Sequence, residues 1–387
     1  MVAAAFLGAV VVFGVSYTFG VFLKPMAADL HVGHAIMSTL FSLVTALTFF
    51  LAPFTGKLAD RYGPRPILGT GAVLMTAGLL LTARARSFAA VALTYGIGVG
   101  CASAFIYIPA ISAVGEWFKK QRNMALGIAV SGIGCGTLVA APLSAVLIDR
   151  YGWRESFVIF GWASGALLLI AAALMARPPA GAERIKISVI HKCRTSAFGF
   201  LYISLMFSGV AVYIAFVFIP AYAADIGISR VAAAAVIGYI GAASVVGRLG
   251  LNALAPRFGL VTTYQASFVI LLASYALWLM ARSYPLLAVF GLVMGVGYGG
   301  IAAMAPAVAA ELFGVEGLGE LLGILTTGFG AACLVGPPLA GVMVDYTHDY
   351  KWPVFLAFGA ALLALALVIP LQRRREQPGD ERAAGAA

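Results

Sequence analysis

The stretch Gly98-Val99-Gly100, followed by Pro109, returns near the other end of the chain as Gly295-Val296-Gly297, followed by Pro306. The repeat extends outward from this stretch at an offset of 195 to 197 positions. Glu116 and Phe118 recur as Glu311 and Phe313, and the run 60–63 recurs in degenerate form as 256–259. Pro142-Leu143 recurs as Pro338-Leu339, and Asp149 recurs as Asp345. A unit of about half the chain has therefore been duplicated.

Both copies of this unit are strongly apolar. Hydrophobic residues make up 62% of the chain and charged residues only 10%, whereas soluble domains carry about 25% charged residues. Apolar runs of about 20 residues cross the hydrocarbon of a bilayer as helices. Because the runs are continuously apolar rather than alternating, they favour helices over a β-barrel. Twelve such runs lie near 2–23, 35–56, 67–83, 88–115, 123–148, 155–176, 196–223, 231–254, 261–281, 285–310, 320–343 and 353–372.

The sequence therefore predicts an all-α membrane protein of twelve transmembrane helices in two six-helix pseudo-repeats, a pattern typical of transporters. We expect an N-terminal bundle at 1–176, a cytoplasmic linker at 177–195, a C-terminal bundle at 196–372 and a disordered tail at 373–387. With both termini in the cytoplasm, the inner segments hold 16 lysines and arginines and the outer segments eight. This excess follows the positive-inside rule. We therefore interpret the net charge as a topology signal in a bacterial inner membrane, and we expect no nucleic-acid partner.

Neither the cysteines nor the histidines have the spacing of a metal site. Cys101, Cys135, Cys193 and Cys333 fall in four different segments, and the four histidines lie in or beside loops. The predicted spans contain no histidine cluster, Ser/His pair or carboxylate dyad. We therefore expect no metal, no cofactor and no intramembrane enzyme.

The inner loop expected after the second span reads Gly56-Lys57-Leu58-Ala59-Asp60-Arg61-Tyr62-Gly63-Pro64-Arg65. Asp60 can accept hydrogen bonds at a helix N-terminus or pair with Arg61 or another basic group. Such a contact would hold the inner helix ends together in one conformation and release them in the other; the alternative is a solvated turn. The candidate conformational latch comprises Gly56, Asp60, Arg61, Gly63 and Arg65. This loop resembles the signature of the major facilitator superfamily between its second and third helices.

Arg248 is the only basic residue well inside a predicted span. An arginine at the bilayer centre costs about 2.5–3.5 kcal/mol, so a lipid-facing position is unfavourable. Steps of three and four along the helix place it on one small and polar stripe, away from the apolar Val246 and Leu249. The members of the stripe are Gly241, Ser244, Arg248 and Asn252. We expect Arg248 to face the protein interior; the alternative is snorkelling toward the inner headgroups.

An interior arginine without an intramembrane carboxylate favours an anion from outside. The planar guanidinium suits a carboxylate, and a single cation balances a monocarboxylate such as lactate or pyruvate but leaves the second charge of oxalate uncompensated. Tyr17, Tyr107 and Tyr298 are candidate hydroxyl donors, and Cys333 could line the cavity opposite Arg248. Helix packing is the alternative for each of them. Tyr213 and Tyr239 are weaker candidates.

Three stretches resemble the monocarboxylate transporter group of the superfamily and the related oxalate–formate exchangers. They are Ser16-Tyr17-Thr18-Phe19-Gly20-Val21-Phe22, Glu116-Trp117-Phe118 with residues 119–127, and Gly247-Arg248-Leu249. In that family the arginine of the eighth span binds the substrate carboxylate, which implies this role for Arg248. Animal members carry a proton-coupling aspartate one turn earlier, where this chain has Ser244. Oxalate exchangers carry a lysine in the eleventh span, whereas no lysine occurs here between Lys192 and Lys351.

The sequence thus predicts a secondary active transporter of short monocarboxylates that works by alternating access and is coupled to protons. An organic-anion exchanger of the oxalate/formate type is the alternative, and a non-transporting nutrient sensor is a third possibility. The expected partners are a small monocarboxylate anion, a proton and the lipid bilayer, and we expect a monomer.

Overall fold

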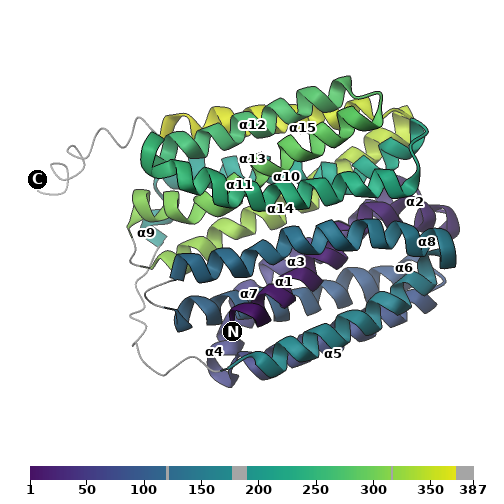
Figure 1. Cartoon of the computed structure of the whole chain (residues 1–387), viewed down its shortest axis with the longest axis horizontal. Helices are drawn as coiled ribbons and strands as arrows, with labels where there is room; N and C mark the ends of the chain where they lie inside the picture. Colours follow the sequence, from purple (N-terminus) through teal and green to yellow (C-terminus); the bar gives the residue numbers. More distant parts are fainter. Residues whose placement is uncertain (119–121, 177–189, 315–316, 372–387) are drawn as a thin grey trace, which may run out of the picture.

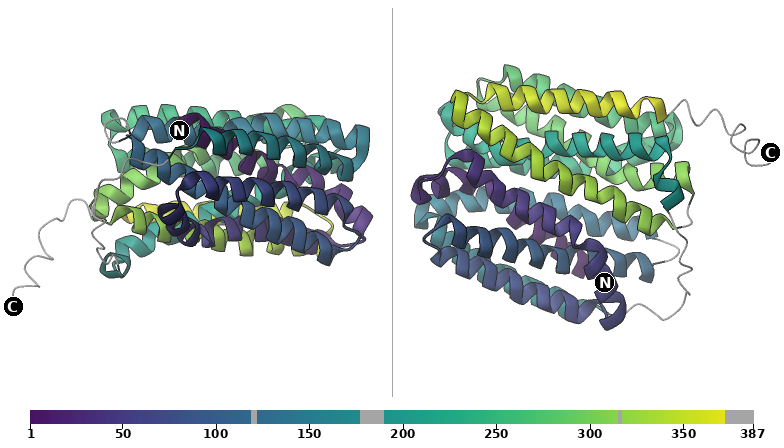
Figure 2. Two further views of the ribbon diagram at one scale, coloured as in Figure 1. Left: turned by 90° about the horizontal axis from the view of Figure 1, so that it is seen from below. Right: turned by 180° about the vertical axis from the view of Figure 1, so that it is seen from behind.

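The computed structural model describes residues 1–118, 122–176, 190–314 and 317–371 (Figure 1). All regular structure within these ranges is helical. Most of the predicted linker, at 177–189, and the predicted tail at 373–387 lie outside the described residues. The helices lie side by side along the long axis of the molecule, with the two halves of the sequence in two adjoining groups (Figures 1 and 2).

The N-terminal half runs from α1 to α8. Its first span consists of α1 (Val2–Tyr17) and α2 (Phe19–Leu30), and its second of α3 (His34–Phe50) and α4 (Ala52–Tyr62). The third span is α5 (Pro64–Arg84), and the fourth joins α6 (Phe88–Val91), η1 (Ala92–Val99) and α7 (Gly100–Trp117). The long α8 (Arg122–Leu174) contains a break at Gly152, whose φ of 81° is not helical.

The C-terminal half runs from α10 to α15, after the short helix α9 (Ile190–Cys193). Its helices are α10 (Ser196–Asp225), α11 (Arg230–Phe258), α12 (Leu260–Met280), α13 (Tyr284–Phe313), α14 (Leu318–Thr347) and α15 (Lys351–Val368). Across the described residues, 10 helical segments are long and apolar enough to span a membrane, and the bent pair α3 and α4 makes 11. The break at Gly152 divides α8 into two spans, so the prediction of twelve is confirmed.

The backbone repeats itself at an offset of 196 residues. α5 and α12 begin and end 196 positions apart. Left-handed turns, which glycine adopts most easily, recur at the same offset: His31 and Gly227 have φ of 53° and 82°, Gly63 and Gly259 of 90° and 89°, and Gly152 and His348 of 81° and 51°. The duplication seen in the sequence is therefore also a duplication of helix boundaries.

The two halves meet along pairs of long helices, chiefly α3 with α14 and α8 with α11. Small residues line both contacts and let the backbones approach closely. A Cβ on Gly341 would lie 2.6 Å from the Cα of Ala35, and one on Gly134 would collide with the carbonyl oxygen of Gly241. We call the end of the molecule where α14 finishes and α3 begins the Asp345 end, and the opposite end, where α4 and α9 lie, the linker end (Figure 1).

The stretch 56–65 differs from the predicted loop. α4 continues as far as Tyr62, bent by 48° from α3, with Pro53 in its first turn, where the missing N–H of proline is no disadvantage. Asp60 lies in the last turn of α4, and its acceptance of hydrogen bonds at a helix N-terminus stays a prediction. Only Gly63, with a φ of 90°, turns the chain into α5.

Candidate anion-binding site

Arg248 of α11 is buried at the interface of the two halves, with 5% of its surface exposed. Ser244, one turn earlier, is also buried, whereas Val246 and Leu249 are exposed on the outside of the bundle. Arg248 therefore faces the protein interior, as predicted, and does not snorkel. Asn252, one turn further along the same polar stripe, is exposed, so the buried part of the stripe ends at Arg248.

The guanidinium of Arg248 donates one hydrogen bond to the other half of the protein. Its Nη1 donates a hydrogen bond of 2.6 Å to the main-chain oxygen of Val130 on α8. Its Nε and Nη2 are buried and have no hydrogen-bond partner. These two nitrogens form one edge of the guanidinium, and their N–H groups point the same way, which is the fork that a carboxylate accepts from. Arg248 thus presents an unfilled bidentate position.

No carboxylate of the described residues fills that position. Their ion pairs lie elsewhere, and none includes Arg248. A buried cation with two unpaired donors is unfavourable by several kcal/mol, about 3–5 where a partner has been removed. An anion that entered this position would remove that cost.

Two tyrosines flank the guanidinium, one from each half. The Arg248 Cζ lies 5.7 Å from the ring centroid of Tyr298 on α13, within range of a cation–π attraction. Tyr107 on α7 lies near both Arg248 and Tyr298. The site is therefore built from both halves, as a carrier with a substrate site at the repeat interface requires.

These two tyrosines belong to a group of six aromatic rings in mutual contact, which we call the aromatic cluster. It comprises Phe13, Tyr17, Tyr107, Tyr213, Phe216 and Tyr298. Ring centroids lie 4.8 Å apart for Phe13 and Tyr107, 4.3 Å for Tyr17 and Phe216, and 6.1 Å for Phe216 and Tyr298. Tyr17 also packs against Tyr213, with ring centroids 6.3 Å apart, and lies near Tyr298. The structure therefore brings together Arg248 and all three tyrosines singled out in the sequence.

Cys333 of α14 packs against α3 of the other half. It is fully buried, its main-chain oxygen accepts a 2.6 Å hydrogen bond from Ser42, and its Sγ is 3.9 Å from the main-chain oxygen of Phe41. Tyr213 lies near Cys333 and so connects it to the cluster. Tyr239 does not join the cluster, since its hydroxyl lies 2.8 Å from that of Tyr284.

Sequence reasoning missed Phe13, Phe216 and the Val130 carbonyl. Phe13 lies one turn before Tyr17, and their centroids are 5.0 Å apart, so helical spacing could have identified it. A main-chain oxygen carries no sequence signal. The candidate latch residues lie apart from this site, at the linker end: Gly56, Asp60 and Arg61 in α4, Gly63 between the helices and Arg65 in α5. Within the described part of the chain, no group of three or more His, Cys, Asp or Glu could hold a metal ion.

The sequence matches the family model described as Major Facilitator Superfamily over residues 5–262 and 201–387. Monocarboxylate transporter 4 of Rattus norvegicus is 27% identical over 391 residues, which cover 95% of this chain and 82% of that protein. Monocarboxylate transporter 2 of Homo sapiens is 27% identical over 408 residues, covering 95% and 83%. A solved bacterial homologue of the human lysosomal transporter Spinster, inward-facing and occupied, superposes with a TM-score of 0.79 at 16% identity over 96% of each chain. This likeness confirms the predicted fold.

Proposed function

Because this chain belongs to the Major Facilitator Superfamily, we propose that it is a secondary active transporter of short monocarboxylates such as lactate or pyruvate. It works by alternating access and moves its substrate together with a proton. The similarity to monocarboxylate transporters over 95% of the chain supports the substrate class. The monomer in a bacterial inner membrane, with both termini cytoplasmic, is part of the same proposal.

One observation carries the proposal, namely the empty fork formed by Nε and Nη2 of Arg248. A substrate carboxylate accepts both N–H groups, while Nη1 keeps its bond to Val130. The tyrosine hydroxyls of the aromatic cluster donate to the remaining oxygen atoms of the substrate, and the rings contact its short apolar part. A buried bidentate pair of this kind is strong and orients the acid.

The charge of the site favours one carboxylate over two. Arg248 is the cation at the site, and the described residues around it in the aromatic cluster are neutral at pH 7. Oxalate would place its second negative charge against tyrosines in a medium of low dielectric, which is unfavourable. The oxalate/formate exchanger therefore remains the second candidate.

Alternating access follows from the way the two halves share the site. Arg248 and Tyr298 belong to the C-terminal half, whereas Tyr107 and Val130 belong to the N-terminal half. A substrate held between them contacts both halves at once, and its carboxylate neutralises the buried guanidinium. The halves then rock about the occupied site. The buried residues that the structure describes include no aspartate, glutamate or histidine that could carry the proton. The proton therefore travels with the acid or through water beside Arg248.

Uptake of labelled acids by purified protein in proteoliposomes tests this function. Wild-type protein is expected to take up lactate and pyruvate, faster when the outside is acidic, and to exchange them in counterflow more readily than oxalate. Arg248→Ala should lose uptake, whereas Arg257→Ala, which changes an exposed arginine of the same helix, should keep it. Faster exchange of oxalate than of lactate would favour the exchanger, and uptake indifferent to the pH gradient would exclude symport.

A further inference from the structure

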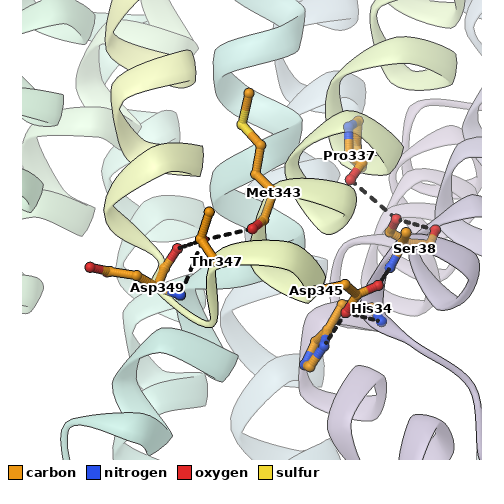
Figure 3. Close-up of polar contacts among 8 residues, drawn as sticks. His34, Ser38, Pro337, Met343, Asp345, Thr347 and Asp349 are labelled. Atoms are coloured by element: carbon orange, nitrogen blue, oxygen red, sulfur yellow. Dashed lines mark hydrogen bonds and ion pairs between the residues drawn. The ribbon is translucent and has the colours of Figure 1, made fainter.

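Asp345 connects the two halves at the Asp345 end by capping a helix of the other half. Its Oδ1 and Oδ2 accept hydrogen bonds of 2.9 Å each from the backbone N–H groups of His34 and Ala35, in the first turn of α3. Its Oδ1 also lies 3.0 Å from Nδ1 of His34 (Figure 3). A carboxylate at a helix N-terminus is favoured both by these donors and by the helix dipole.

The residues at the start of α3, around this contact, leave room for the Asp345 carboxylate and add a further hydrogen bond between the halves. A Cβ on Gly33 would lie 2.6 Å from Oδ2 of Asp345, so only glycine leaves room for the carboxylate there. One turn further along α3, the Ser38 hydroxyl donates to the main-chain oxygen of Pro337 at 3.1 Å, again between the halves (Figure 3). The start of α3 and the end of α14 are thus joined by polar contacts over more than one turn.

The internal repeat contains a second contact between an aspartate and the first residue of a helix in the other half, in the opposite direction. Asp149 precedes Asp345 by 196 residues, and Arg230 follows His34 by 196 residues. Asp149 of the N-terminal half forms an ion pair with Arg230, the first residue of α11 in the C-terminal half. Asp345 of the C-terminal half binds His34, the first residue of α3 in the N-terminal half. A third pair between the halves, Lys24 with Asp225, lies at the same end.

The two repeat-related contacts differ in the backbone bonds that Asp345 accepts and in the basic side chain that meets the aspartate. An arginine stays charged at all relevant pH values, whereas an imidazole changes its charge between about pH 5 and 8. We propose that Asp345 with His34 and Asp149 with Arg230 form a paired gate that holds the Asp345 end closed, and that His34 makes this closure respond to pH. The inference rests on the proposed alternating access but not on the identity of the substrate.

The sign of the response follows from the two states of the gate. In the closed state, a protonated His34 adds a charge-assisted hydrogen bond to the two backbone bonds that Asp345 already accepts. In the open state the two residues are separated by water, so protonation of His34 adds little stability to that state. Lower pH therefore favours closure, and this extra stability is lost as the pH rises. Because the two side chains are 28% and 29% exposed, we expect a shift of about threefold to fivefold in the ratio of closed to open protein.

Apart from other histidines, the charged and titratable groups around His34 keep their charge over this range. The ring of Tyr350 lies 6.4 Å from that of His34, and burial raises the pKa of Tyr350, so it stays neutral. A hydrogen bond from the backbone N–H of Lys351 is the main cause of the lowered pKa of Asp349. Asp349 therefore stays ionised. Lys24 and Asp225 remain paired. His31 and His348 are exposed histidines at the same end and therefore serve as controls.

Energy transfer between two fluorophores measures the closure directly. The dyes are attached through non-natural amino acids at two exposed positions at this end. Arg86 lies between α5 and α6 of the N-terminal half, and Ser283 lies between α12 and α13 of the C-terminal half. The full-length protein is placed in lipid nanodiscs without substrate and with the same pH throughout, so that no gradient acts. Lowering the pH from about 8 to about 5.5, across the range of imidazole titration, should increase energy transfer in wild-type protein.

Variants then assign the response to its residue. His34→Arg should remain closed at both pH values, His34→Gln should lose the response, and Arg230→His should enlarge it. His31→Gln and His348→Gln should respond like wild type. A response that persists in His34→Gln and His34→Arg, or one that is absent from wild type, overturns the paired gate as a pH sensor. Arg248→Ala should keep the response, so failure of the gate and failure of the proposed substrate site give different results.

Discussion

At the scale of single residues, the proposed function depends on how Arg248 divides its donors. One N–H group holds the Val130 carbonyl of the other half, and the two on the opposite edge are free. The sequence could identify Arg248 because it is the only basic residue deep within a span and lies on a stripe of small residues. The Val130 carbonyl could not be predicted, because every residue has a main-chain oxygen. The exposure of Asn252 depends on where the stripe leaves the interface, which spacing along one helix does not reveal.

Replacing Arg248 with lysine tests the fork separately from the charge. Arg248→Lys keeps the cation but cannot present two parallel N–H groups to one carboxylate. We expect the KM for lactate to rise about tenfold or more, which corresponds to the loss of one charge-assisted hydrogen bond. Initial uptake rates over a range of lactate concentrations provide the measurement, with Arg257→Lys as the control. A KM equal to that of wild type would show that charge alone suffices.

The ring of Tyr298 and its hydroxyl have separable effects. Tyr298→Phe keeps an aromatic face beside the guanidinium, whereas Tyr298→Leu removes the cation–π attraction, worth about 0.5–2 kcal/mol at such sites. We expect the KM for lactate to rise moderately in the phenylalanine variant and more strongly in the leucine variant. Equal KM values in the two variants would mean that the ring does not hold Arg248 in place.

At the scale of helices, α8 and α11 approach each other through glycine. A Cβ on Gly134 would lie 2.7 Å from Cγ2 of Val245 and would collide with the Gly241 carbonyl, whereas a Cβ on Gly127 would meet nothing within 4 Å. This contact lies beside the site, because Arg248 reaches from α11 to Val130 on α8. The proximity of the two helices therefore determines whether one substrate can contact both halves.

Alanine at these two glycines tests that proximity. Gly134→Ala should reduce uptake about tenfold or more, because overpacking of about 1–3 kcal/mol separates α8 from α11. Gly127→Ala, on the same helix, should transport normally. Both variants should elute as folded protein in size-exclusion chromatography, so that uptake reports the helix contact. Normal uptake by Gly134→Ala would show that transport does not need this close approach.

The stretch 56–65 shows where helix prediction was limited. Gly56, Asp60, Gly63 and Pro64 are residues typical of turns, and they predicted a loop. In the structure the helix continues to Tyr62, and Gly63 alone provides the turn. A single helix can tolerate turn-forming residues where its backbone bonds remain satisfied. The position of a turn is therefore decided by the one residue with positive φ, which composition does not identify.

At the scale of the whole molecule, the class of fold was largely predictable. A bilayer permits only helices or closed barrels, so long apolar runs and their duplication led to twelve helices in two halves. The pairing of α3 with α14 and of α8 with α11 could not be predicted, since it depends on contacts between residues far apart in the chain. The repeat did contain a clue, because Asp149 and Asp345 recur in register with Arg230 and His34.

The orientation of the molecule in the membrane leads to a further prediction. The proposed orientation, with both termini in the cytoplasm, places the Asp345 end outside. Tyr346, with 85% of its surface exposed, lies at this end, whereas Lys57 is exposed in α4 at the linker end. A membrane-impermeant thiol reagent added to intact cells should label Tyr346→Cys but not Lys57→Cys above the background of the parent protein. Labelling of Lys57→Cys alone would invert the topology.

Binding of lactate to the detergent-purified protein, measured by isothermal titration calorimetry, tests the carboxylate site of Arg248 most directly. The wild-type protein and Arg257→Ala should bind lactate with similar affinity, and Arg248→Ala should lose binding by about 100-fold or more, as expected for a buried bidentate pair. Binding of lactate by folded Arg248→Ala with wild-type affinity would contradict the assignment of the substrate carboxylate to this guanidinium.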